Sequence, residues 1–329
     1  MADRYSRQEL FKEIGKEGQK RIENSSITIV GVGALGSVSA DLLVRAGIGR
    51  MKIFDNDKVE ESNLQRQSLY VENDVSKYKV EALKIHLEKI NSNVRIEAIT
   101  ERICAENIDK IKADVIIDGT DNMETRFLLN EYSKKGKIPF IYGAASGSIG
   151  VVYNVLADGA CLSCIFNDSK NLATCDTDGV ISSTTHIVAS MQVAEALKII
   201  LGKNPSKELM RFDVWKNKFE NFKVNKSAKC MVCIGEYSLL DKKNYEEFVV
   251  SECKTKSAYT AKPKKKMLLD IRKITKNFET VEDAVIIAVI KIKDEEIIVH
   301  DYGELLFKTL TEVDRIKEIA KEIYKVGKR

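Results

Sequence analysis

The sequence predicts an α/β fold with a Rossmann-like, doubly wound and mostly parallel sheet, extended by antiparallel strands and followed by a small C-terminal α+β unit. A β-branched run, Ile27–Val30, leads into a glycine-rich turn and a helical pattern. Strand-like and helix-like segments then alternate as far as Tyr142, which is typical of a parallel sheet. Two later β-rich stretches, 148–157 and 209–224, have no helix between their halves and predict antiparallel strands.

Apolar periodicity predicts the individual elements in chain order. Up to the second β-rich stretch we expect helices over 4–22, 75–90, 123–135 and 191–201, and strands over 27–30, 51–54, 94–99, 114–118 and 139–142. Near the C-terminus we expect strands over 285–293, 295–300 and 305–309 and a helix over 313–326.

The chain divides into three predicted parts. Residues 1–250 form the main domain, and 267–329 form the small α+β domain. Between them, 251–266 reads as an exposed basic linker, because Lys254 to Lys266 holds six lysines, Pro263 and no acid.

Composition bounds the classes of function. With 53 basic and 49 acidic residues, the net charge of +4 is too small to indicate nucleic acid or a membrane surface as a partner. The N-terminus lacks the apolar core of a signal peptide, and no run approaches a membrane-spanning length, so we expect a cytoplasmic protein. In that reducing compartment the seven cysteines indicate metal ligands or nucleophiles rather than disulfides.

The glycine turn indicates a nucleotide site, although a lone motif of this kind can also be an ordinary turn. Gly31 and Gly33 leave room for a phosphate, and Gly36 allows close packing of helix and strand. Ala34 belongs to the same turn, where the helix N-terminus offers N–H groups to an anion. Asp55, nineteen residues after Gly36, ends the next strand, where an acid can hold ribose hydroxyls.

A polar loop after that acid favours a triphosphate over a nicotinamide cofactor. Arg66 and Asn63 can contact a triphosphate, which a nicotinamide cofactor does not have. The candidate nucleotide-binding residues of this stretch are Asp57, Ser62, Asn63, Leu64, Gln65 and Arg66.

This stretch resembles a known family. Asp55-x-Asp57-x-Val59 followed by Ser62-Asn-Leu-x-Arg66-Gln is similar to the ThiF/MoeB/HesA group, bacterial and archaeal relatives of ubiquitin-activating enzymes. The resemblance covers Tyr5 to about Gly235. It implies that ATP is used to adenylate the C-terminal glycine of a small ubiquitin-like sulfur carrier, whose tail ends in Gly-Gly.

The resemblance also implies roles for residues outside the loop. Arg7 would reach into the ATP site of the partner subunit of a homodimer, as an arginine finger, and Lys79 would contact the triphosphate. Asp121 and Asn122 follow the carboxyl end of a strand, where Asp121 could hold Mg²⁺ against the phosphates. The alternative for this Asp-Asn pair is a helix N-cap, and the family's matching motif favours the metal and nucleotide role.

Two Cys-x-x-Cys pairs predict a structural Zn²⁺ site. Cys161 with Cys164 and Cys230 with Cys233 supply four thiolates, which complete a tetrahedral site with no open position. The alternative, two redox dithiols, needs a thioredoxin-like fold beside each pair, and the sequence lacks one. Zinc-bearing members of the family have four cysteines in these places.

Cys175 is the candidate nucleophile for sulfur transfer. It lies in a polar stretch where a thiolate could form, and Thr174-Cys175 before Gly179-Val180 matches the family. The following stretch, 181–186, departs from the family because it is polar, which leaves the downstream partner open. No cysteine follows position 253, so we expect the sulfur donor to be a separate sulfurtransferase or desulfurase.

These observations predict an adenylyltransferase that uses ATP and Mg²⁺. Two alternatives share part of the evidence: an NAD-dependent oxidoreductase, which uses the same strand, turn and acid, and a non-catalytic scaffold that only presents a carrier. Arg66, Lys79 and Asp121 together argue against the scaffold. The sequence leaves the carrier open among thiamine synthesis, molybdopterin synthesis, tRNA thiolation and protein conjugation.

Overall fold

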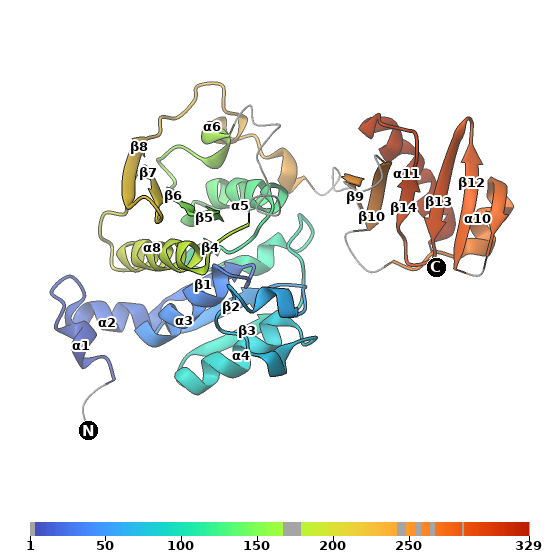
Figure 1. Cartoon of the computed structure of the whole chain (residues 1–329). Coiled ribbons are helices and arrows are strands. Elements are labelled where there is room, and N and C mark those ends of the chain that lie inside the picture. The colour runs from blue at the N-terminus through green and yellow to red at the C-terminus, as the bar shows by residue number, and fades with distance from the viewer. Residues whose placement is uncertain are drawn as a thin grey trace. The chain divides into compact units, whose positions relative to one another are not determined.

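The structure is a computed structural model, and it describes residues 4–166, 179–241, 248–253, 258–263, 267–284 and 286–328. The chain forms two compact units, Met1–Asn244 and Tyr245–Arg329 (Figure 1). No helix in the described ranges combines the length and the apolar character that crossing a bilayer requires.

The first unit is built on an eight-stranded sheet of order β3-β2-β1-β4-β5-β6-β7-β8. The first five strands in this order are parallel, and β6, β7 and β8 extend the sheet antiparallel, as the sequence predicts. The strands are β1 Ser26–Val30, β2 Arg50–Phe54, β3 Arg95–Ile99, β4 Val115–Asp118, β5 Phe140–Ser146, β6 Ile149–Val155, β7 Glu208–Asp213 and β8 Lys218–Lys223.

The central strands end at the same edge of the sheet. Val30, the last residue of β1, pairs with Phe54 of β2 on one side and with Asp118 of β4 on the other. All four residues of β4 are buried, because the sheet is covered on both faces there. The polar residues that follow β1, β2 and β4 are therefore brought together.

Helices cover both faces of this sheet. In Figure 1, α5 lies on one side and α3 and α8 lie on the other. α3 packs against α4 and α8, and α8 also contacts β4, β5 and β6. The helices are α1 Ser6–Glu9, α2 Gly15–Asn24, α3 Gly36–Ala46, α4 Lys79–Ile90, α5 Met123–Gly136, α6 Leu162–Ile165, α8 Ser182–Ile200 and α9 Met231–Ile234, with short 3₁₀ turns η1 Glu61–Asn63, η2 Glu72–Asp74, η3 Ile108–Ile111 and η4 Ser238–Leu240.

Three predicted helix boundaries were wrong. The helix expected over 4–22 is two helices, because the chain turns between them and Gly15 has a positive φ of 59°. The helix expected from 75 begins at Lys79, after η2 and after Ser76, whose φ of 73° is incompatible with a right-handed helix. The helix expected from 191 begins at Ser182, so the prediction left out its polar first turns.

The second unit is a six-stranded antiparallel sheet of order β11-β12-β13-β14-β10-β9 with two helices. Its own core includes Ile290, Val299 and Ile323, all fully buried. The elements are β9 Phe248–Cys253, β10 Ala258–Pro263, α10 Ile271–Asn277, β11 Glu279–Asp283, β12 Ile287–Ile292, β13 Glu295–His300, β14 Leu305–Phe307 and α11 Val313–Gly327. The three predicted strands and the last helix are present with small shifts.

The prediction of a basic linker over 251–266 was wrong. This range holds the end of β9 and all of β10, and the two units divide at 244/245 instead. The strand β10 tolerates its lysine because side chains alternate across a sheet: Lys262 is exposed, whereas its neighbour Ala261 is fully buried. Tyr324 of α11 donates a hydrogen bond to the Ala261 carbonyl at 2.9 Å, which fixes β10 to the unit.

Candidate functional site

A cavity of about 480 Å³ opens at the carboxyl ends of β1, β2 and β4. Open α/β sheets bind their ligands at this edge. The cavity is lined by the glycine turn, the loop after β2, the start of α4, the turn after β4 and the segment before α8. Its lining residues are Val30, Gly31, Gly33, Ala34, Leu35, Phe54, Asp55, Asn56, Asp57, Gln65, Arg66, Gln67, Lys79, Glu101, Arg102, Ile103, Gly119, Thr120, Asp121, Asn122, Thr125, Arg126, Ala145, Gly179, Val180 and Thr185.

The glycine turn has the close packing that its sequence predicts. A Cβ added to Gly36 would lie 1.9 Å from the Gly31 carbonyl oxygen, and Gly31 itself has a positive φ of 83°. Gly36 is therefore a packing residue beneath the cavity and does not line it. Gly31, Gly33 and Ala34 do line it, so backbone at the start of α3 faces the space where a phosphate could bind.

Asp55 is held rigidly in the cavity wall. One carboxylate oxygen accepts from the Val32 N–H at 2.9 Å and the other accepts from the Asp57 N–H at 2.8 Å. Burial raises the pKa of Asp55, while Lys79 and the two backbone N–H groups oppose that rise. The geometry places an acceptor at the end of β2, where ribose hydroxyls would lie.

Lys79 is the first residue of α4 and is buried, yet its amino group reaches the cavity. Its Nζ lies 3.1 Å from Asp57 Oδ2, and Asp57 is more than half exposed. The exposed carboxylate of Asp57 is thus the ion-pair partner of this cation. A polyphosphate would offer Lys79 a stronger anionic partner in the same place.

The polar loop contributes only part of what the sequence predicts. Arg66 and Gln65 line the cavity, and the Arg66 guanidinium also donates to the Ser62 carbonyl at 3.0 Å. Ser62, Asn63 and Leu64 are outside the lining. Asn63 is buried, and its side chain accepts from the Glu60 N–H at 3.3 Å, so it shapes η1 rather than facing the cavity.

Gln67 is a candidate ligand-binding residue that the sequence analysis did not select. It is only 4% exposed, it lines the cavity, and its Oε1 has no hydrogen-bond partner among the described residues. A buried amide left without a partner costs free energy, which a bound ligand would recover. The signal was present, because Gln67 directly follows Arg66 in the loop.

Asp121 and Asn122 have different roles in the turn after β4. Asn122 is the N-cap of α5, where its side chain accepts from the Thr125 N–H at 2.9 Å. Asp121 is exposed, lines the cavity, and within the described residues has one long hydrogen bond, of 3.5 Å from Asn122. Because its oxygens are hardly engaged there, Asp121 is free of strong competitors for a Mg²⁺ ion that also takes phosphate oxygens. Asn122 therefore takes the N-cap alternative, and the metal role of Asp121 stays a prediction.

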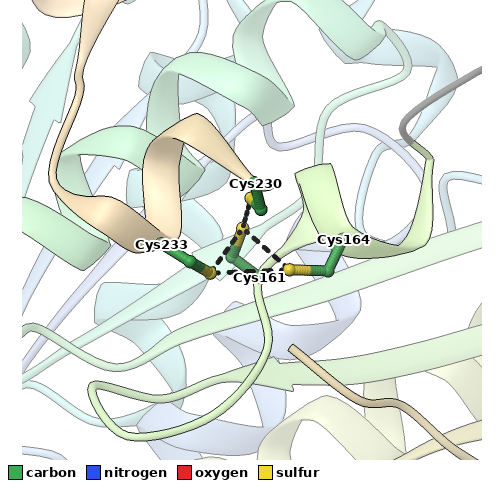
Figure 2. A group of neighbouring side chains, drawn as sticks. All are labelled: Cys161, Cys164, Cys230 and Cys233. Atoms are coloured by element: carbon green, nitrogen blue, oxygen red, sulfur yellow. Dashed lines mark hydrogen bonds between the residues drawn. The ribbon is translucent and has the colours of Figure 1, made fainter. Parts of the chain in front are cut away.

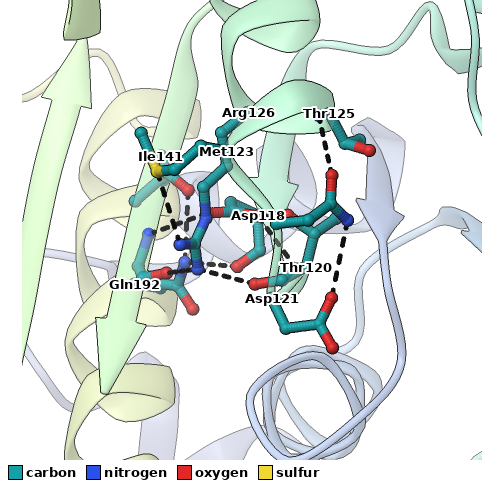
Figure 3. A network of polar contacts seen from close by, with 10 residues as sticks. Asp118, Thr120, Asp121, Met123, Thr125, Arg126, Ile141 and Gln192 are labelled. Carbon is teal, nitrogen blue, oxygen red and sulfur yellow. Dashed lines mark hydrogen bonds and ion pairs between the residues drawn. The ribbon is translucent and has the colours of Figure 1, made fainter. Parts of the chain in front are cut away.

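Beneath that turn lies a buried polar network that the sequence did not indicate (Figure 3). Arg126 is paired with Asp118, with Nε 2.9 Å from Oδ2, and both are buried. Gln192 of α8 donates to the carbonyls of Asp118 and Ile141 at 2.8 and 3.1 Å. Gln192 is 74 and 51 residues from its partners, and Arg126 and Asp118 lie on different elements, so no local spacing could have revealed the network.

Arg7 lies outside the cavity lining of its own chain. It is exposed on α1, although its neighbours are fixed: Gln8 donates to the Ala46 carbonyl at 3.0 Å, and the Tyr5 hydroxyl accepts from Asn91 at 2.9 Å. The structure therefore presents Arg7 on an anchored helix, pointing to solvent in this single chain.

The four predicted zinc ligands come together (Figure 2). Cys161 Sγ lies 3.5 Å from Cys230 Sγ, 3.5 Å from Cys233 Sγ and 3.9 Å from Cys164 Sγ. A tetrahedron with Zn–S bonds of about 2.3 Å has edges of about 3.8 Å, so the sulfurs have the spacing of a Cys₄ zinc site. Cys161 and Cys230 are buried, which is typical of a closed structural centre.

The electrostatics of the cluster also favour a cation. Burial, together with the neighbouring sulfurs of Cys161 and Cys164, raises the pKa of Cys230 to about 11. Four thiolates at this spacing would repel each other strongly, and a divalent ion removes that cost. The sequence candidate Cys175 lies outside the described residues.

With this geometry in place, comparison with known proteins identifies the chain's family. Residues 5–232, more than half of the chain, match the model of the ThiF family. The chain belongs to the ThiF family.

Two curated proteins illustrate its relatives. This ThiF-family chain is 46% identical over 224 residues to the sulfur carrier protein ThiS adenylyltransferase of Bacillus subtilis, covering 66% of each protein. It is 33% identical over 259 residues to the sulfur carrier protein adenylyltransferase of Thermus thermophilus, covering 75% of this chain and 96% of that protein. The chain therefore spans about two thirds of the length of the Bacillus subtilis relative.

Solved structures confirm the fold of this ThiF-family chain. The crystal structure of Escherichia coli MccB with ATP superposes with a TM-score of 0.63 at 23% identity, covering 71% of this chain and 75% of MccB. At this identity the likeness concerns the fold alone.

Proposed function

We propose that this chain uses Mg²⁺·ATP to adenylate the C-terminal glycine of a small ubiquitin-like sulfur-carrier protein. The single observation that carries the proposal is the convergence of Asp55, Arg66, Lys79 and Asp121 on one cavity beside a glycine turn. Family membership and the adenylyltransferases among its relatives support the same reaction. A nicotinamide cofactor could use the two cations for its pyrophosphate, but it requires no divalent cation and so gives no reason for Asp121 to face the same cavity.

The residues divide the chemistry between them. Asp55 holds the ribose, the backbone of the glycine turn binds phosphate, and Lys79 and Arg66 stabilise the charge that builds on the phosphates. Asp121 would hold the Mg²⁺ that neutralises phosphate oxygens. The carboxylate of the carrier's last glycine attacks the α-phosphorus, the bond to the bridging oxygen breaks, and pyrophosphate leaves. An acyl-adenylate remains on the carrier.

Pyrophosphate exchange tests this proposal. With a Gly-Gly-ended carrier present, labelled pyrophosphate should enter ATP, and Asp121→Ala should lower the exchange rate by at least about 100-fold. The matched control is Asp158→Ala, because Asp158 is an exposed carboxylate that forms a salt bridge with Lys207 and lies outside the cavity lining. Exchange that persists undiminished in Asp121→Ala would contradict the role of this carboxylate.

Three further assignments belong to the same proposal. The Cys₄ cluster binds a structural Zn²⁺, and its free thiols suit a reducing compartment such as the cytoplasm. Arg7 completes the ATP site of the partner subunit in a homodimer. Cys175 acts in the later sulfur transfer, for which a separate donor protein supplies the sulfur.

A further inference from the structure

The buried ion pair between Asp118 and Arg126 lies directly under the turn that carries Asp121 (Figure 3). Asp118 is the last residue of β4 and is fully buried, and Arg126 is 5% exposed in the first turns of α5. An isolated buried pair is poor evidence for stability, because desolvation costs about as much as the attraction gains. The Asp118–Arg126 pair must therefore contribute through the backbone that it holds in place.

The Asp118–Arg126 pair forms hydrogen bonds with Thr120 through both its N–H and its carbonyl group. Asp118 Oδ1 accepts from the Thr120 N–H at 2.9 Å and from the Thr120 hydroxyl at 2.7 Å. Arg126 Nη2 donates to the Thr120 carbonyl at 2.6 Å and to the Gly143 carbonyl of β5 at 3.0 Å. The peptide groups on either side of Thr120 are thus tied to the pair, and Asp121 begins from a fixed backbone.

The same turn is pressed against the phosphate-binding backbone. A Cβ added to Gly119 would lie 2.1 Å from the Gly31 carbonyl oxygen, so the two turns are in direct backbone contact. The Asp121 side chain, by contrast, has one hydrogen bond to the part of the chain that the structure describes, the 3.5 Å contact with Asn122. The position of its carboxylate relative to the glycine turn is therefore set by the backbone that the ion pair clamps.

We infer that the Asp118–Arg126 pair is a positioning device that places the Asp121 carboxylate for the divalent cation accompanying ATP. The inference deepens the proposed function and rests on it, since it takes Mg²⁺·ATP as the ligand of the cavity. Arg126 touches the backbone of the turn and acts through Asp121. A lysine cannot replace it, because one ammonium group cannot reproduce the planar fork that contacts Asp118, Thr120 and Gly143 together.

The test measures how much Mg²⁺ strengthens nucleotide binding. It uses calorimetry on the full chain without any carrier. A non-hydrolysable ATP analogue is titrated with Mg²⁺ and again with excess chelator, and the ratio of the two Kd values is the gain from the metal. For Arg126→Lys we expect this gain to fall by about tenfold, while the affinity for the metal-free analogue changes by less than about twofold. A merely structural role would not move this ratio.

Lys134→Gln is the matched control. Lys134 is the other buried cation of α5, and it donates to the carbonyls of Leu156, Ala157 and Gly159 at 2.9 to 3.0 Å. It lies near the far end of the helix and outside the cavity lining. This variant should lower Tm and keep the full metal gain.

Thr120→Val keeps the charges and removes one hydroxyl contact with Asp118. If Arg126→Lys fails to fold, this variant tests the positioning role instead. It should lose a smaller part of the metal gain than Arg126→Lys. The inference is overturned if the wild type shows no metal gain, or if a folded Arg126→Lys, or Thr120→Val in its place, retains all of it. If the gain falls as expected but no carrier ever supports pyrophosphate exchange, the proposed function fails and the positioning role stands.

Discussion

At the residue scale, the proposed ribose-binding role of Asp55 comes at a cost in folding stability. Its carboxylate accepts two backbone N–H groups at the end of β2, yet burial raises its pKa above the ordinary value. The ionised form is therefore less favourable in the folded chain than in the unfolded one. A protein that needs an acceptor for ribose hydroxyls tolerates this cost at its binding site.

Asp55→Asn tests that balance. A raised folded-state pKa means that the wild type loses stability as pH rises from the unfolded value, about 4, through the folded value. The amide has no such loss, although its NH₂ group cannot accept from one of the two backbone N–H groups. The free energy of unfolding of the variant relative to the wild type should therefore increase as pH rises from about 4 to 7. ATP affinity should fall by about tenfold or more, because an amide is a weaker acceptor for the ribose hydroxyls. Urea unfolding across pH and ATP titration measure both, and a relative stability that falls over this pH range would contradict the account.

The sequence was most informative where chemistry and local pattern coincide. Gly31, Asp55 and Lys79 lie at the ends of elements whose periodicity is clear, so their meeting follows from a parallel sheet. Arg126 and Gln192 could not be predicted, because their partners lie on other elements and their own neighbours in sequence are unremarkable helix formers. Asn63 was assigned to the cavity from its type, whereas its amide is used in a local turn.

At the element scale, the four-cysteine cluster joins two short helices, α6 and α9. They have four residues each, and each begins directly after a cysteine of the cluster. Helices this short are unstable in isolation. Binding of the proposed zinc ion would therefore be coupled to the folding of this part of the first unit.

Cys233→Ser should lose the metal and destabilise the first unit. We expect less than one Zn²⁺ per chain by elemental analysis and a fall in Tm of several degrees, because the remaining thiolates bind zinc far more weakly. Cys104→Ala is the control, since Cys104 is also buried but lies outside the cluster. Equal zinc content in Cys233→Ser and Cys104→Ala would argue that the four sulfurs are not a zinc site.

The second unit shows where composition misleads. A lysine-rich stretch with a proline reads as a linker, but β9 and β10 pair with each other and β10 pairs with β14, from another part of the chain. The pairing of β10 with β14 is non-local. Exposed lysines are compatible with strands near the edge of a sheet. The charge pattern agrees with the exposure of Lys262 and gave no information on strand pairing.

At the scale of the whole molecule, the single chain leaves Arg7 exposed and outside its own cavity lining. Exposed apolar side chains, Leu10 and Phe11, follow it on the same anchored segment, with 74% and 57% of their surface accessible. A second copy of the chain would cover them and receive Arg7 at its ATP site.

Mixing two inactive variants tests this arrangement. Arg7→Ala and Asp121→Ala should each lose pyrophosphate exchange, whereas an equal mixture that exchanges subunits should recover about a quarter of the wild-type rate. One site of each mixed dimer then has an intact Asp121 and receives an intact Arg7. No recovery, with subunit exchange verified by native mass spectrometry, would show that Arg7 does not act across a dimer.

The most direct test of the central claim is the intact mass of the carrier itself. A Gly-Gly-ended carrier is incubated with the protein, Mg²⁺·ATP and pyrophosphatase, and its mass is measured at once by mass spectrometry. The account predicts a carrier heavier by one adenylyl group, which disappears when its last glycine is removed. If the protein binds ATP but no such carrier gains this mass, the claim that this cavity adenylates a protein tail is contradicted.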